Sequence, residues 1–115
     1  MIKTFAFSLA LILIAPAAIA HSPLSSTTPA NGATLQQAPD AIEFVFKRNI
    51  RITKVTWSKA SGDSGQLDLG SQTNFATDFS IPFPNADTGT FEINWRGLGD
   101  DGHPQMGRFS FIVEE

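Results

Sequence analysis

The 115-residue sequence contains no cysteine, only two histidines and only two methionines. Without cysteine the chain forms no disulfide, and it has no thiol to which a lipid anchor could be attached. Its stability must therefore come from an apolar core. The histidines are His21 and His103, so an imidazole-based site can use only these two positions.

Only the start of the chain has a long apolar run. Lys3 supplies a positive charge, residues 5–15 are apolar, and Ala18-Ile19-Ala20 has the small-x-small pattern of a signal-peptidase site. Pro16 interrupts the run and no charged stop-transfer stretch follows, which makes it a poor membrane anchor. We therefore predict a cleaved signal peptide over residues 1–20.

Cleavage there would leave residues 21–115 as one small domain of 95 residues with no membrane anchor. Loss of Lys3 changes the formal charge from −3 to −4, before the new α-amine is counted. The remaining basic residues are scattered and outnumbered by acids; their one concentration, residues 47–54, is interpreted as the solvated side of a strand and turn. Nothing in this charge pattern indicates nucleic acid or an anionic membrane as a partner, and we expect none.

No sustained helical period appears after the apolar start. Hydrophobic residues instead alternate at period two, and turn signals separate the alternating runs. Besides a first extended segment that contains Leu24, the predicted strands are residues 41–46, 50–57, 66–69, 75–84, 90–96 and 109–113. A break in phase predicts a bulge near Thr53-Lys54, and Pro82 favours an edge strand. The pattern predicts an all-β fold, a seven-stranded antiparallel Greek-key β-barrel or sandwich, with most phenylalanines in its core.

A predicted glycine-rich loop, residues 97–107, joins the last two strands and contains Asp100-Asp101-Gly102-His103-Pro104. Asp101 and His103 are two residues apart, so in an extended segment both side chains point to the same side. Asp100 would face the other way, toward water or the loop backbone. Met106 is the one methionine left after cleavage and is interpreted as a packing residue.

Together these residues suggest a metal site. Copper(II) favours tetragonal sets of nitrogen and oxygen donors, and imidazole suits it well. As the first mature residue, His21 would offer an α-amine and an imidazole, to which His103 adds a nitrogen and Asp101 an oxygen. Each half of this set also has a structural interpretation, since a terminal histidine is often only exposed and Asp-Gly-His-Pro is often a polar turn.

The same residues resemble a known family. The mature chain is similar to the CopC family of periplasmic copper-binding proteins, which are small Greek-key β-barrels related in shape to immunoglobulin domains. The matching parts are His21 with Leu24, residues 29–33, residues 89–96, Asp101-Gly102-His103-Pro104 and residues 107–111. The resemblance implies that His21, through its amine and imidazole, Asp101 and His103 bind copper(II). Ser22-Pro23 departs from the alanine that commonly follows the histidine in the family.

Some family members also have a methionine-rich copper(I) site with a further histidine. His21 and His103 already account for every histidine here, and Met106 stands alone. The resemblance therefore implies a copper(II)-only protein of the periplasm. We expect a monomeric, non-catalytic protein that stores copper or delivers it, with an inner-membrane copper transporter as a candidate partner.

Two other functions stay open from the sequence. A small oxidative copper enzyme, of the kind that lytic polysaccharide monooxygenases represent, also uses an N-terminal histidine, but 95 residues is short for a substrate platform. A plain β-sandwich interaction module would bind no copper tightly and would tolerate changes at His21. Copper binding and oxidation activity separate the three hypotheses.

Overall fold

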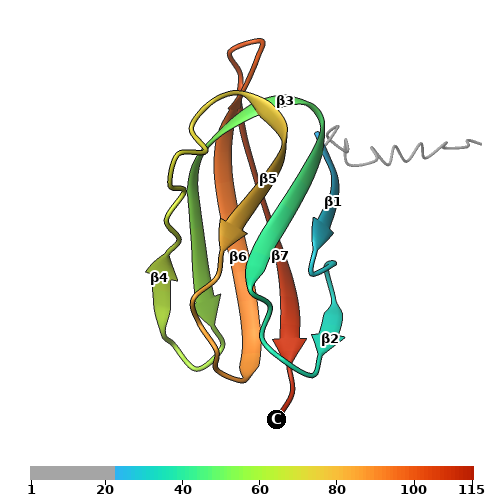
Figure 1. Ribbon diagram of the computed structural model, residues 1–115, viewed down its shortest axis with the longest axis vertical. Coiled ribbons are helices and arrows are strands. Elements are labelled where there is room, and N and C mark those ends of the chain that lie inside the picture. Colours follow the sequence, from blue (N-terminus) through green and yellow to red (C-terminus); the bar gives the residue numbers. More distant parts are fainter. Residues whose placement is uncertain (1–22) are drawn as a thin grey trace, which may run out of the picture.

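The computed structural model describes residues 23–115, which form seven β-strands. No helix among these residues could span a membrane. The strands are β1 (Leu24–Thr28), β2 (Ala33–Leu35), β3 (Ala41–Lys59), β4 (Ser64–Gln66), β5 (Ala76–Pro82), β6 (Gly89–Gly99) and β7 (Pro104–Val113) (Figure 1). The all-β prediction is confirmed.

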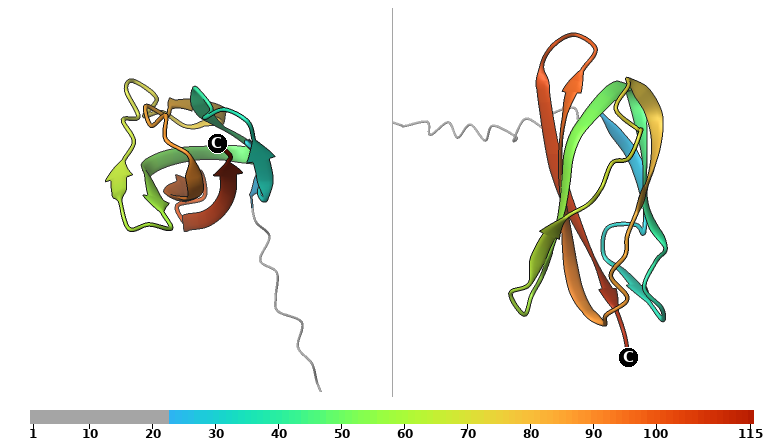
Figure 2. Two further views of the ribbon diagram at one scale, coloured as in Figure 1. Left: turned by 90° about the horizontal axis from the view of Figure 1, so that it is seen from below. Right: turned by 60° about the vertical axis from the view of Figure 1, so that its left-hand side comes forward.

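Strand β3 belongs to both layers of the fold. Its first part, residues 41–46, pairs with β1 on one side and β5 on the other. From Ile50 onward β3 pairs with β6 and, near its end, with β4, while β6 continues the layer to β7 and then β2. Figure 2 shows the resulting sandwich, in which β1 and β5 face β6 and β7. This topology resembles an immunoglobulin-like Greek key.

Two predictions about β3 had different outcomes. The predicted bulge near Thr53-Lys54 is confirmed by a register shift between Ile52 and Lys54 against β6. The prediction of two separate strands, 41–46 and 50–57, is wrong because the chain stays extended through the intervening residues. Residues 47–49 are all exposed, so the alternation of buried side chains stops there without a turn.

The core consists of alternate side chains from both layers, as period-two patterning requires. No polar or charged side chain is buried among the described residues. The buried set is Ile42, Phe44, Phe46, Ile50, Ile52, Val55, Leu67, Phe79, Ile81, Phe83, Phe91, Ile93, Trp95, Phe109, Phe111 and Val113. Leu24 packs against this core, as expected, whereas Phe75 is 44% exposed.

Two glycines leave room for tryptophan side chains on the neighbouring strand. Gly107 pairs with Trp95 across β6 and β7, and a Cβ on Gly107 would lie 2.8 Å from the indole Nε1. Gly65 has the same relation to Trp57, at 2.7 Å. Each indole therefore occupies the space above a neighbouring strand that a side chain would otherwise fill.

Three predicted boundaries or orientations are wrong. β4 lies at Ser64–Gln66 rather than at 66–69, because Gly65 pairs with Trp57 of β3. β2 pairs with β7 in the parallel direction, so the sheet is mixed rather than purely antiparallel. The loop that carries Asp101 and His103 is shorter than predicted, because β6 extends to Gly99 and β7 begins at Pro104. The edge position of Pro82 is confirmed, since β5 pairs only with β3 within residues 23–115.

Candidate metal centre

The candidate site lies at the tip of the long β6–β7 hairpin. The two strands pair continuously from Gly89 with Val113 to Leu98 with Pro104, and only residues 100–103 lie between them. The predicted glycine-rich loop over residues 97–107 is therefore wrong in its extent, because only residues 100–103 form the turn. Gly97 allows close packing instead: a Cβ there would lie 2.9 Å from both the Arg51 carbonyl oxygen and Ile50 Cγ2.

Backbone hydrogen bonds define the turn. The Gly99 amide donates to the His103 carbonyl at 2.9 Å, and the Gly102 amide donates to the Gly99 carbonyl at 2.9 Å. Gly102 has φ +86°, a left-handed conformation that glycine adopts without strain. The turn is therefore a defined structure at the end of a paired ladder, visible at the top of Figure 1.

Asp101 and His103 contact each other at this tip. Asp101 Oδ1 accepts a hydrogen bond from the His103 backbone amide at 3.0 Å, and Asp101 Oδ2 lies 3.1 Å from His103 Nδ1. Both side chains face solvent, with 52% of Asp101 and 77% of His103 exposed. They meet because the chain turns at Gly102, and not because the segment is extended, as the sequence-based argument assumed.

These contacts favour the ionised carboxylate. The hydrogen bond from the His103 backbone amide, and then the one from its side chain, lower the pKa of Asp101 below its ordinary value of 3.8. The carboxylate is therefore charged at neutral pH and available to a cation. Asp100 is exposed, as predicted.

The structure brings together two of the three predicted ligands. His21 lies outside the described residues. The described part begins at Pro23, whose carbonyl accepts a hydrogen bond from the Lys47 amide at 2.7 Å, and continues into Leu24, which pairs with Phe46. The start of β1 lies toward the same end of the molecule as the β6–β7 turn (Figure 1). Within residues 23–115 no three His, Cys, Asp or Glu side chains form a group that could hold a metal.

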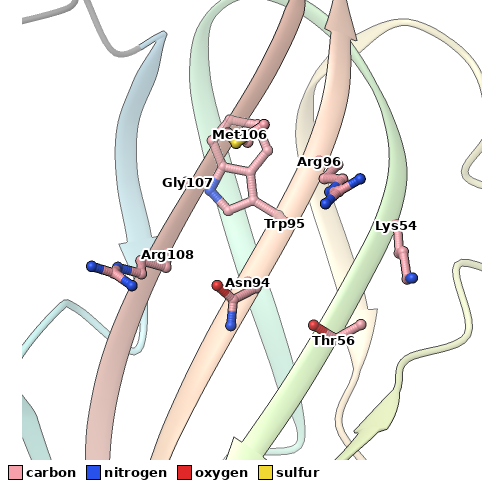
Figure 3. Close-up of a pocket in the computed structure, with 8 residues that line it drawn as sticks. All are labelled: Lys54, Thr56, Asn94, Trp95, Arg96, Met106, Gly107 and Arg108. Atoms are coloured by element: carbon pink, nitrogen blue, oxygen red, sulfur yellow. The ribbon is translucent and has the colours of Figure 1, made fainter.

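Met106 is not the packing residue that the sequence suggested. It is 68% exposed on the outer face of β7, because the ladder places Gly107 and Phe109 toward the interior and Met106 and Arg108 toward solvent. Met106 lines a groove on the outer face of β3, β6 and β7, shown in Figure 3. No pattern in the sequence pointed to this groove.

Comparisons with known proteins agree with one another. A family model described as the CopC domain matches residues 24–114. Protein YobA of Escherichia coli strain K12 is 27% identical, over 97% of this chain and 96% of its own length. Copper resistance protein C of Escherichia coli is 26% identical, over 88% of this chain and 87% of its own.

Solved structures share the fold. CopC from Methylosinus trichosporium OB3b superposes with a TM-score of 0.66 at 17% identity, covering 82% of this chain and 94% of its own. PcoC, a methionine-rich copper resistance protein from Escherichia coli, gives a TM-score of 0.58 at 23% identity, covering 83% and 100%. At these identities the likeness establishes the architecture alone.

Proposed function

Because this chain belongs to the CopC family, whose domain model matches residues 24–114, we propose that it is a periplasmic copper(II)-binding protein. Family membership and the relationship to a copper resistance protein support a copper-related function. The proposal adds the ligands: the α-amine and imidazole of His21, the carboxylate of Asp101 and the imidazole of His103. It also requires removal of residues 1–20, so that His21 begins the mature chain.

The contact between Asp101 and His103 carries this proposal. Their Oδ2 and Nδ1 atoms are 3.1 Å apart. Two donors that each bind a first-row metal at about 2.0–2.1 Å and at right angles would be about 2.9 Å apart. Copper(II) would replace the Nδ1 proton that His103 donates to Asp101 in the metal-free protein, with little change in the separation of the two atoms. Copper(II) accepts both an imidazole nitrogen and a carboxylate oxygen.

A third residue must complete the set, and His21 is the remaining histidine of the sequence. It precedes Pro23 by two residues, which limits it to within about 7 Å of that anchored position. An α-amino group ionises near pH 8 in peptides, so at neutral pH a metal readily displaces its proton. Amine, two imidazoles and a carboxylate would make four equatorial donors.

The exposure of the Asp101-His103 pair suits storage or transfer of copper. An ion held at a solvent-facing turn can pass to another protein without opening the core, and an inner-membrane copper transporter is a candidate recipient. CopC-family proteins are copper-binding and copper-resistance proteins and are not known enzymes. The alternative, an oxidative copper enzyme, predicts peroxide formation with ascorbate by the copper-loaded chain and its loss in His103→Ala.

Neighbouring aspartates provide a matched test of the ligand assignment. Asp101→Asn and Asp100→Asn remove the same charge one residue apart, and both positions are exposed. In a competitive copper(II) titration of protein starting at His21, Asp101→Asn should weaken binding about tenfold or more, while Asp100→Asn should change it less than about twofold. Equal effects of the two substitutions would mean that charge alone, and not ligation by Asp101, attracts the ion.

A further inference from the structure

We propose that the outer face of β3, β6 and β7 is a docking surface for an acidic, extended segment of a partner protein. Lys54, Arg96 and Arg108 define this basic face, one from each strand. All three side chains are exposed. In Figure 3, Arg108 lies on one side of Asn94, and Arg96 and Lys54 lie on the other. The surface does not require copper, so it can be tested separately from the metal site.

The strand register gathers residues that are far apart in the sequence. Lys54 lies directly opposite Arg96, and Arg108 lies directly opposite Asn94, which in turn lies opposite Thr56. Neighbouring strands are about 4.8 Å apart, so the three cations span roughly 10 Å across the sheet. Residues that looked scattered along the chain thus form one basic face.

None of the three cations of this face forms an ion pair within the described residues. Neither of the two ion pairs found in residues 23–115, Lys59 with Asp87 and His103 with Asp101, includes a residue of the basic face. Like charges directly opposite each other on a sheet are destabilising, as at Lys54 and Arg96. An incoming carboxylate would relieve this repulsion.

Acidic residues are nearly absent from the surrounding strands. β6, β7 and residues 50–59 of β3 contain one acid, Glu92, which accepts a hydrogen bond from the Asn94 side-chain amide at 3.2 Å. The whole chain nevertheless carries a formal charge of −3. The basic face is therefore a local reversal of the overall sign, and complementarity favours an acidic partner.

The shape and the donors of the groove indicate a polypeptide rather than a small anion. Its volume is about 450 Å³ and it is open to solvent. The strand amides beneath it are engaged in the β-ladders, so no ring of free backbone N–H groups is present to enclose a phosphate. Binding would depend on long side chains spread across three strands, which suits several separate carboxylates.

An extended acidic peptide fits that spacing. Alternate residues of an extended chain are about 6.7 Å apart on one side, so successive carboxylates can reach cations on different strands. Met106, opposite Arg96 and 68% exposed, offers a flexible apolar contact for the methylene groups of such a peptide. Charged and apolar contacts thus lie within one groove.

The test is a titration of ¹⁵N-labelled, metal-free protein starting at His21 with a capped octapeptide of alternating glutamate and serine, at low ionic strength. Amide signals should shift for residues 54–56, 94–96 and 106–108. The double variant Lys54→Gln/Arg96→Gln should bind about tenfold more weakly. Lys47→Gln/Arg48→Gln removes the same two charges from exposed positions outside the groove and should change affinity less than about twofold.

Other arms of the experiment identify the ligand class. Raising the salt to about 1 M, where the Debye length is about 3 Å, should abolish binding. Lys54→Glu places an acid opposite Arg96, so it should remove peptide binding while the protein keeps or raises its melting temperature. Both results are expected if the basic face is the binding surface.

Four results would overturn the proposal. These are no shift with the peptide, equal weakening in the two double variants, unchanged binding by Lys54→Glu, or inorganic phosphate binding as tightly as the peptide. The last would identify a small-anion site instead.

Discussion

The β6–β7 hairpin contains both fully buried core residues and, at its tip, two of the proposed copper ligands. In the middle of β6 and β7, Phe91 and Phe111 are fully enclosed, with ring centroids 5.5 Å apart. At its tip, Asp101 and His103 face solvent and contact mainly each other. Because the residues that stabilise the fold and those proposed to bind copper are separate, changing one group should leave the other intact.

The largest expected effect is on stability, at the buried end. Phe91→Ala removes a ring that packs against Phe83 and Phe111, and should lower the free energy of unfolding by about 3–5 kcal/mol. Urea unfolding of the metal-free protein measures this. Under conditions where the variant remains folded, its copper affinity should match that of the parent; a large loss would show that core and tip are coupled.

The converse change is at the tip. His103→Ala should leave the free energy of unfolding within about 0.5 kcal/mol, because the imidazole is exposed and the backbone hydrogen bonds of the turn remain. Copper(II) affinity should fall about 100-fold, since one of four donors is lost. Thermal unfolding and competitive titration on the same sample compare both quantities, and substantial destabilisation would contradict the separation of roles.

Two glycines of the hairpin, one in its packed middle and one at its tip, allow the two regions to be perturbed separately. Gly107→Ala places a Cβ 2.8 Å from the Trp95 indole and should cost about 1–3 kcal/mol by overpacking. Gly102→Ala meets no atom within 4 Å, but its φ of +86° should cost about 1–2 kcal/mol of backbone strain at the turn. We expect Gly107→Ala to alter the near-ultraviolet circular dichroism of Trp95 and to leave copper affinity unchanged. We expect Gly102→Ala to alter copper affinity and to leave the Trp95 signal unchanged.

The smallest effect is on the ionisation of Asp101. Its pKa is lowered chiefly by the His103 backbone amide, which His103→Ala retains, and secondarily by the side chain, which it removes. In a carbon-13 NMR titration the pKa of Asp101 should therefore rise in His103→Ala but stay below 3.8. Because folding lowers this pKa, the ionised carboxylate of Asp101 stabilises the folded state fully at pH values above 3.8. This stabilisation is lost as the pH falls through the folded-state pKa. A pKa that does not change would argue against the side-chain contact.

Alternation along the sequence predicted most of the fold because burial follows it closely. In Thr90–Arg96 every second residue is buried, and the break in phase near Thr53 corresponds to an observed register shift. The parallel pairing of β2 with β7 could not be predicted in this way. β2 is three residues long, and its pairing depends on how the chain returns to the hairpin rather than on its own pattern.

The candidate site was predicted by residue type, but its geometry was not. The scarcity of histidine pointed to His103, while the glycines around it suggested a loop over residues 97–107. In the folded chain Gly97 and Gly107 allow close packing, so the ladder extends to the turn. The basic face lay beyond sequence reasoning, because Lys54, Arg96 and Arg108 become neighbours only through the register of three strands.

The most direct test of the copper proposal compares two forms of the mature protein. One starts at His21, verified by mass spectrometry, and the other carries one extra residue before it. Competitive copper(II) titration and the electron paramagnetic resonance spectrum of each one-to-one complex are measured. We predict a tight, nitrogen-rich tetragonal site in the first form and much weaker binding in the second, since the α-amine of His21 is then acylated. Equal affinity and identical spectra would contradict ligation by the N-terminal amine and, with it, the proposed site.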